Sequence, residues 1–155
     1  MAGAVEQGVA EILLAGDPRR GLAGLATFAG FTLWSAPASA KEIHAGEEPD
    51  SPDSTVTVIS EGGSAPVRGS HGINPARRPA FTVRSRDHDY TEAQRVAFQI
   101  YRILDGYEGT ANGVPFFHVD ASTEPIPLGR DREDRGGRWV FSHTFNTITK
   151  RYDPS

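Results

Sequence analysis

The chain has 155 residues, the length of a single domain, and no cysteine, which excludes disulfide frameworks, thiol nucleophiles and cysteine zinc sites. Its 16 basic and 20 acidic residues give a net charge of -4, which disfavours a function resting mainly on neutralising nucleic-acid phosphates. The 17 glycines and 11 prolines indicate long loops around a modest framework of helices and strands. We therefore expect one domain over residues 1–155.

The first predicted element is a helix over residues 4–14. Its apolar residues recur at helical spacing and share one face: Val5, Val9, Ile12 and Leu13. Gly16 and Pro18 follow the helix and cannot continue it cheaply. A loop is then expected over residues 16–24, followed by a buried strand over residues 28–34.

The same region imitates an export signal. Arg19 and Arg20 precede an uncharged stretch, residues 21–40, which ends in small residues as a cleavage site does. Two features weigh against this reading. An acidic, helical segment lies upstream, and the stretch is too rich in Gly, Ser, Thr and Pro for a membrane span. An exported soluble protein remains an alternative.

The middle of the chain alternates loops and strands. Residues 47–53 are acidic, carry two prolines and predict a surface loop, while the β-branched residues over 55–60 predict a strand. Residues 62–79 are expected to form a long loop with three arginines: Arg68, Arg77 and Arg78. A second strand is predicted over 80–86, and its apolar-face residues are Phe81, Val83 and Ser85.

A second helix is expected after this strand and should end at Gly106. Asp89 can cap its N-terminus, with Glu92 reaching back as the second half of a capping box. One face carries an apolar stripe made of Ala93, Val96, Ala97, Ile100, Ile103 and Leu104. Because Arg95, Gln99 and Arg102 lie on the opposite face, this helix should cover a sheet with one side and meet solvent or a partner with the other.

Three strand segments are predicted near the C-terminus. Residues 115–121 form a short strand, and residues 126–128 lead into a charged loop over 129–138 whose two final glycines suit a hairpin turn. The longest strand covers 139–149, with one face made of Trp139, Phe141, His143 and Phe145. The next apolar residue is Ile148, which predicts a bulge or a change of packing partner after Phe145.

Only one group of residues suggests catalysis or metal binding. His118 and Asp120 point the same way from a strand, and the remaining members would be His143, His88 and Asp87. The chain has no HExxH, GxxxxGK[ST] or GxSxG sequence. His143 sits between two phenylalanines of an apolar face, where a structural histidine is the usual finding. We therefore expect no enzyme, no metal and no cofactor.

The order of elements predicts an α+β fold. A mostly antiparallel, mixed β-sheet should carry two α-helices packed on one face, with long loops. The other face and the sheet edges are then left for partners. The alternating charges over residues 130–135 suit either a solvated hairpin tip or pairing across subunits.

Two stretches resemble a known family. Residues 124–131 read EPIPLGRD and residues 137–145 read GRWVFSHTF, which is similar to the ending of phage tail terminator proteins, often labelled minor capsid proteins. Upstream, IHAGEEP over residues 43–49, then Pro52 and the strand over 55–59, resemble that family's acidic loop and first sheet strand. The loop over 62–79 is long for the family.

The resemblance implies a structural virion protein made in the host cytoplasm. Members close the head-proximal end of the tail tube, commonly as a hexameric ring, stop tube growth and present a surface to neck proteins. The implied partners are further copies of the chain, the tail tube protein and a neck or head-completion protein, with DNA only passing through the lumen and no membrane. The candidate contacts are Arg68, Arg77, Arg78, Arg95, Arg102, Arg130, Arg132 and Arg135. The alternatives are another neck or head-completion protein, or an exported binding module or hydrolase.

Overall fold

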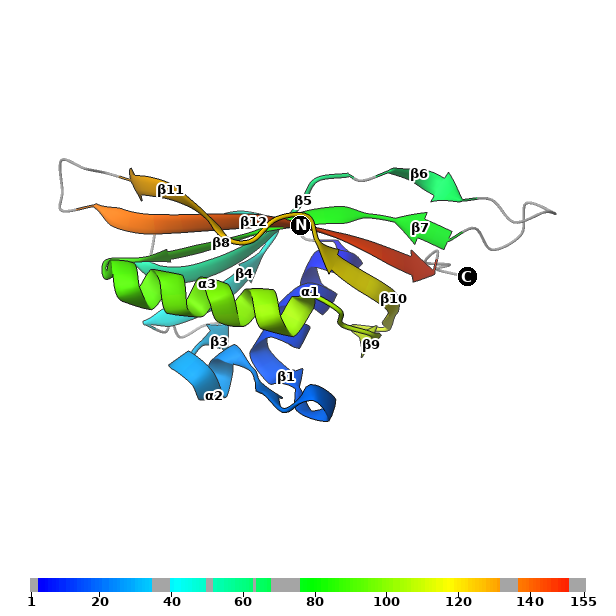
Figure 1. Ribbon diagram of the computed structural model, residues 1–155, viewed down its shortest axis with the longest axis horizontal. Coiled ribbons are helices and arrows are strands. Elements are labelled where there is room, and N and C mark those ends of the chain that lie inside the picture. The colour runs from blue at the N-terminus through cyan, green and yellow to red at the C-terminus, as the bar shows by residue number, and fades with distance from the viewer. Residues whose placement is uncertain are drawn as a thin grey trace.

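The computed structural model describes residues 3–34, 40–49, 52–62, 64–67, 76–131 and 137–150. It has the α+β architecture expected from the sequence, with a curved sheet above a layer of helices (Figure 1). None of the helices within these ranges is long and apolar enough to cross a lipid bilayer.

One large sheet organises the chain. Its main path runs β3 (Thr32–Leu33), β4 (Lys41–Ala45), β5 (Ser54–Ser60), β8 (Ala80–Asp87), β12 (Arg138–Lys150), β10 (Val114–Ala121) and β9 (Gly109–Ala111). Off this path, β11 (Ile126–Asp131) and β7 (Ala76–Arg78) also pair with β12, and β6 (Ser64–Val67) pairs with β7. The pairs β3–β4 and β4–β5 are parallel and the others are antiparallel, as the predicted mixed sheet requires.

The helices pack beneath one face of this sheet. They are α1 (Ala4–Ala15), α3 (Tyr90–Leu104) and a short α2 (Leu25–Ala29). The turn after α1 contains a two-stranded pair, β1 (Gly16–Asp17) with β2 (Leu22–Ala23), around the 3-10 turn η1 (Pro18–Arg20). Gly8 lets α1 approach the sheet closely, since a Cβ there would lie 3.1 Å from the Phe116 ring.

The core lies between the helices and the inner face of the sheet. The stacked rings of Phe81 and Phe145, with centroids 5.5 Å apart, form its centre, and both side chains are fully buried. The predicted helix stripes face this core. Placing Gln99 on the opposite, exposed face of α3 was wrong, because its side chain is buried and donates to the Ala23 carbonyl at 2.8 Å. Burial of large apolar side chains of this kind stabilises a fold by about 1.5–3 kcal/mol each. The inner-facing sets predicted for β8 and β12 are confirmed.

The outer face of the sheet is polar. Thr82 and Thr144 lie 3.1 Å apart across β8 and β12. Glu48, from the predicted acidic loop, folds over this face and pairs with Arg84 at 3.1 Å and Arg86 at 3.6 Å. Arg86 is 4% exposed, and it also donates to the Pro52 carbonyl. The loop is therefore held against the sheet by arginines rather than left in solvent.

The prediction of a buried strand over residues 28–34 was wrong. This segment begins inside α2, which ends where Gly30 adopts the left-handed conformation at φ 76°, and only Thr32–Leu33 pair as a strand. Trp34 is 67% exposed. Leu25 and Phe31 supply the buried apolar surface that the sequence had placed on a continuous strand.

The prediction that residues 62–79 form only loop was also wrong. Strands β6 and β7 lie in this segment, and β7 pairs with the end of β12 through Ala76 and Arg77. Figure 1 shows the two strands as an arm that projects beyond the helical layer. β7 pairs with a strand more than 70 residues away in the sequence, Ala76 opposite Lys150, so the residues around β7 alone do not indicate that a strand forms there.

The C-terminal hairpin differs from its prediction in two details. β11 extends to Asp131, so its strand takes in the first residues of the predicted charged loop, and its register slips between Pro127 and Gly129. The bulge expected after Phe145 lies instead in the facing strand β10, between Phe116 and His118. The alternation of β12 continues through buried Thr147 and Thr149, and Ile148 faces the outer side.

The predicted start of the second helix is confirmed in part. Asp89 caps α3 by accepting a hydrogen bond from the Thr91 amide at 2.9 Å. Glu92 does not complete a capping box but pairs with Arg95 at 2.9 Å and with Lys41 at 3.8 Å. The hydrogen bond from Arg95 holds the pKa of the Glu92 carboxyl below its usual value.

Candidate functional site

The twin arginines are part of the fold. Arg20 donates to the Ile103 and Asp105 carbonyls at the C-terminus of α3 and forms an ion pair of 2.6 Å with Asp17. Such a contact satisfies carbonyls that have no partner within the helix. Arg19 is exposed and donates to the Glu108 carbonyl. Both arginines that resemble an export signal in the sequence therefore make contacts within the folded domain.

Asp17 is the buried partner in this cluster, with a side chain 4% exposed. Burial alone would raise the pKa of its carboxyl, but the hydrogen bond and positive charge of Arg20, together with the charge of Arg19, outweigh burial and lower the pKa. The cluster ties the turn after α1 to the end of α3. The described part of the uncharged stretch over residues 21–40 is part of the folded domain, because Leu25 and Phe31 lie in the core.

The structure separates the residues proposed for catalysis or metal binding. His118 and Asp120 lie together on the outer face, with Nε2 and Oδ1 2.7 Å apart. His143 lies on the opposite, inner face under α3 and is 1% exposed. At the far end of β8, His88 pairs with Asp53 at 2.5 Å, and Asp87 accepts a hydrogen bond from a serine. Across the described ranges, no three His, Asp or Glu residues form a group that could hold a metal ion.

His143 behaves as a structural residue of the core. Its ring packs edge-on against Phe145, with centroids 4.9 Å apart. Neither ring nitrogen has a hydrogen-bond partner among the residues that the structure describes, and burial lowers the pKa of the imidazole to about 3. The ring is therefore neutral at physiological pH and is unsuited to act as a general acid there.

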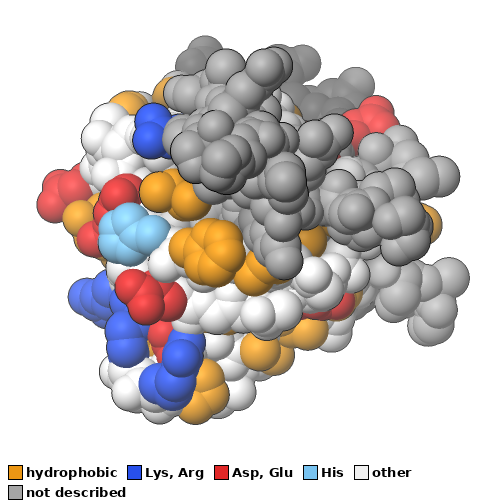
Figure 2. Space-filling view, turned by 90° about the vertical axis from the view of Figure 1, so that its right-hand side faces the viewer, with side chains coloured by type: hydrophobic (Ala, Val, Ile, Leu, Met, Phe, Trp, Pro, Cys, Tyr) orange, Lys and Arg blue, Asp and Glu red, His pale blue; other side chains and the backbone are white. Residues whose placement is uncertain are grey.

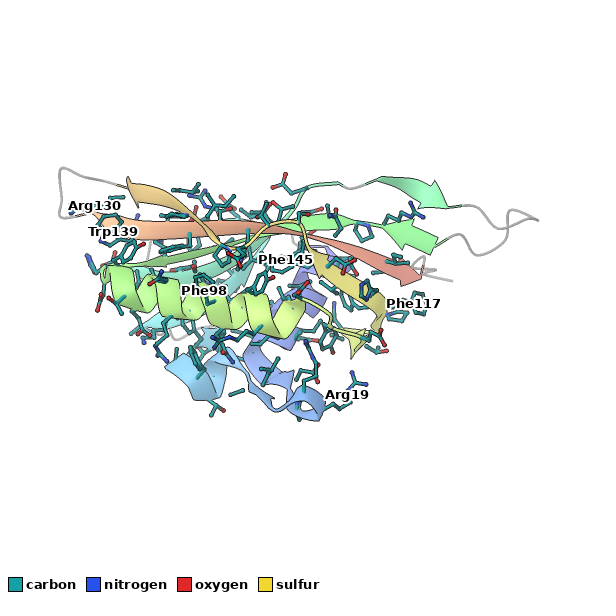
Figure 3. All side chains as sticks on the ribbon, in the orientation of Figure 1. Arg19, Phe98, Phe117, Arg130, Trp139 and Phe145 are labelled. Atoms are coloured by element: carbon teal, nitrogen blue, oxygen red, sulfur yellow. The ribbon has the colours of Figure 1, made fainter. Side chains whose placement is uncertain are left out.

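The described arginines among the proposed contacts do not form one site. Arg95 and Arg102 are exposed on α3, where the Arg95 guanidinium lies 4.2 Å from the centroid of the Phe28 ring. Arg130 lies over the Trp139 ring at 5.5 Å at one end of the sheet (Figure 3). Arg78 is exposed on β7 at the other end, and Arg77 lies beside it opposite Thr149. Arg68, Arg132 and Arg135 lie outside the described residues.

Exposed apolar side chains form a second set of candidate contacts, which the sequence did not identify. The largest exposed fractions belong to Trp34 at 67%, Leu128 at 56%, Phe117 at 53% and Ile126 at 47%. Phe117 points away from β10 at the end of the sheet (Figure 3). Seen from that end, the molecule carries apolar groups beside a histidine and charged residues (Figure 2). Side chains of this kind are enriched at protein interfaces.

A hollow with an apolar wall lies at the β4 edge of the sheet. It has a volume of about 370 Å³, and its lining includes Gln7, Ala10, Glu11, Leu33, Trp34 and His44. The Trp34 and His44 rings face each other obliquely, with centroids 6.0 Å apart. Tryptophan is enriched at protein contact surfaces, so this hollow is a candidate docking surface.

Comparison with known proteins identifies the family. The model of a family described as bacteriophage tail terminator protein matches residues 29–151, which is more than half of the chain. No curated protein matches the sequence. Among solved structures, a chain from the virion of a native gene transfer agent particle is similar at 12% identity and a TM-score of 0.60, over 97% of this chain and 96% of that chain. The likeness shows a shared fold. From the family match, the chain belongs to the bacteriophage tail terminator family and is a structural protein of the phage tail.

Proposed function

We propose that this protein closes the head-proximal end of the tail tube as a ring of identical copies, most simply six. The ring ends polymerisation of the tube and forms part of the joint between head and tail. The observation that carries the proposal is the β6–β7 arm at the end of β12, which extends past the helical layer (Figure 1), together with the edge strand β11 at the start of β12, here called the β11 arm. The arms leave apolar and charged side chains available to neighbouring molecules.

The arm at the start of β12 supports this most directly. Among the described strands β11 pairs with β12 alone, and Ile126 and Leu128 are about half exposed on it. β11 is an edge strand of the large sheet, because β12 pairs with β8 over the same residues, and its apolar side chains Ile126 and Leu128 are exposed to solvent. An arm of this composition gains stability when a neighbouring molecule covers it, and subunits of a closed ring supply such neighbours on both sides.

The proposed partners are further copies of the chain, the tail tube protein and a neck or head-completion protein. DNA passes through the lumen of the ring without being a specific ligand. The protein would be located in the virion, at the neck end of the tail, and would act by contact rather than by catalysis. We propose the exposed arginines of α3, β7 and the β11–β12 hairpin as contacts to these partners.

The proposal is tested by a tube-growth assay. Adding this protein to polymerising tube protein of the same phage should leave short tubes with a ring at one end in electron micrographs. The variant Arg130→Glu with Arg132→Glu should cap tubes about tenfold less efficiently, because charge reversal at an interface rim weakens association. Its free energy of unfolding should stay within about 1 kcal/mol of the unchanged protein, since surface substitutions have small effects. Tubes that grow unchanged in the presence of the unaltered protein would exclude the terminator role.

A further inference from the structure

Two incompletely covered edges lie on opposite sides of the same sheet. On one side of β12 the strands run outward through β8 and β5 to β4 and the short β3. On the other side lie β10 and β11. β3 pairs with β4 only at Glu42 and Ile43, so within the described ranges β4 continues to Ala45 without a strand partner on that side. β11 has β12 as its one strand partner among the described strands.

The hollow described above lies at the β4 edge. Its walls are apolar where Ala10, Leu33 and Trp34 line it, and its rim is acidic at Glu11, which is exposed. Helix α1, which forms one side, carries Glu6 and Glu11 and no lysine or arginine. One exposed carboxylate beside apolar walls fits an apolar segment that also carries a positive charge.

The β11 arm has this chemistry. Leu128 presents apolar surface at the bulge, and Arg130 follows two residues later on the inner face, where it lies over the Trp139 ring. Ile126 is opposite Ser142 and lies on the outer face. The register slip between Pro127 and Gly129 leaves Leu128 as the extra residue of the bulge, and the Gly129 backbone is in the left-handed region at φ 92°. Because Pro127 has no amide hydrogen and the strand is bulged, this edge is poorly suited to regular strand addition. Contact through side chains is favoured instead.

We propose that the β11 arm of one copy docks into the β4-edge hollow of the next copy, with Leu128 on the apolar walls and Arg130 near Glu11. The two surfaces differ and lie at opposite sheet edges, so their contact is heterologous, and a heterologous contact of this kind closes into a ring when its rotation permits. This inference rests on the proposed function. Beyond the ring itself, it identifies the two surfaces through which neighbouring copies contact each other.

The absence of cysteine from the sequence makes crosslinking a direct test. Leu128→Cys and Glu11→Cys are made separately, mixed under the conditions in which the protein assembles, and treated with a short thiol-specific crosslinker. A crosslinked dimer should appear in the mixture and not with either variant alone. Gln94→Cys, on the exposed face of α3, replaces Glu11→Cys in the matched control and should give no dimer with Leu128→Cys.

A second measurement uses assembly strength. Leu128→Asp should weaken assembly about tenfold or more, since a charge would enter an apolar contact. Arg130→Glu should weaken it about two- to fivefold, and adding Glu11→Arg should restore it, because exposed ion pairs have effects of this size.

The outcomes separate this inference from the function on which it rests. A ring that forms without a crosslink between the Leu128→Cys and Glu11→Cys variants overturns the inference and leaves the ring intact. Crosslinking of Leu128→Cys to the Gln94→Cys control, in place of Glu11→Cys, overturns it in the same way. Failure of the unaltered protein to form any ring with its tube protein overturns the proposed function itself.

Discussion

Replacing Arg20 with methionine is expected to lower the free energy of unfolding by about 2–4 kcal/mol, because a buried carboxylate loses its main partner. Asp17 would keep only a weaker contact with Arg19, at 3.7 Å. The carbonyls of Ile103 and Asp105 would lose their donor at the same time. Urea denaturation followed by circular dichroism measures the effect, with methionine chosen to preserve much of the apolar stem of the side chain.

The neighbouring arginine provides the control. Arg19→Met removes the same charge from a side chain that is 70% exposed, so its cost should be about 1 kcal/mol or less. Equal losses for the two variants would mean that net charge, rather than the contact with α3, determines the effect. An Arg20→Met protein as stable as the original would contradict the role assigned to this pair.

Acid should destabilise the protein through His143. Burial lowers the folded-state pKa of this imidazole from its usual 6.5 to about 3. Below pH 6.5 the unfolded chain therefore binds a proton that the folded chain does not, so stability is fully present above pH 6.5 and declines as the pH falls towards 3. The expected loss is about 1.4 kcal/mol per pH unit, or about 2 kcal/mol between pH 6.5 and pH 5.

The variant His143→Leu tests this linkage, since leucine fills a similar volume and does not titrate. Its free energy of unfolding should fall less steeply between pH 6.5 and pH 5, by about the amount assigned to His143. At pH 7 it should be at least as stable, because two buried nitrogens without partners in the described structure are removed. A matched change at the exposed His118 leaves His143 in place and should keep the acid slope. An unchanged slope in His143→Leu would show that other groups determine the acid response.

Long periodic segments could be predicted from the sequence. α3 and β12 have 15 and 13 residues, and each carries an apolar repeat long enough to separate the helical period from the strand period. α2 and β3 have 5 and 2 residues, too few for any period, and their positions depend on Leu25 and Phe31 filling the core. β7 has 3 residues and owes its pairing to the distant end of β12.

The contact surfaces were harder to predict for a related reason. Charged residues are recognisable in a sequence, but Arg20 proved to hold the end of α3, more than 80 residues further along the chain. In the sequence Leu128 cannot be distinguished from a buried strand residue, but in the structure its side chain is more than half exposed at the sheet edge. Whether an apolar side chain enters the core or an interface depends on which elements pack over it, and that information is not local.

The central claim is that copies of this chain form a closed ring on the tail tube, and native mass spectrometry across a concentration series tests it most directly. The protein is measured alone and with the tube protein of the same phage. We predict a single closed oligomer, either with the protein alone or on addition of the tube protein. A strict monomer at every concentration, with and without the tube protein, would contradict the account.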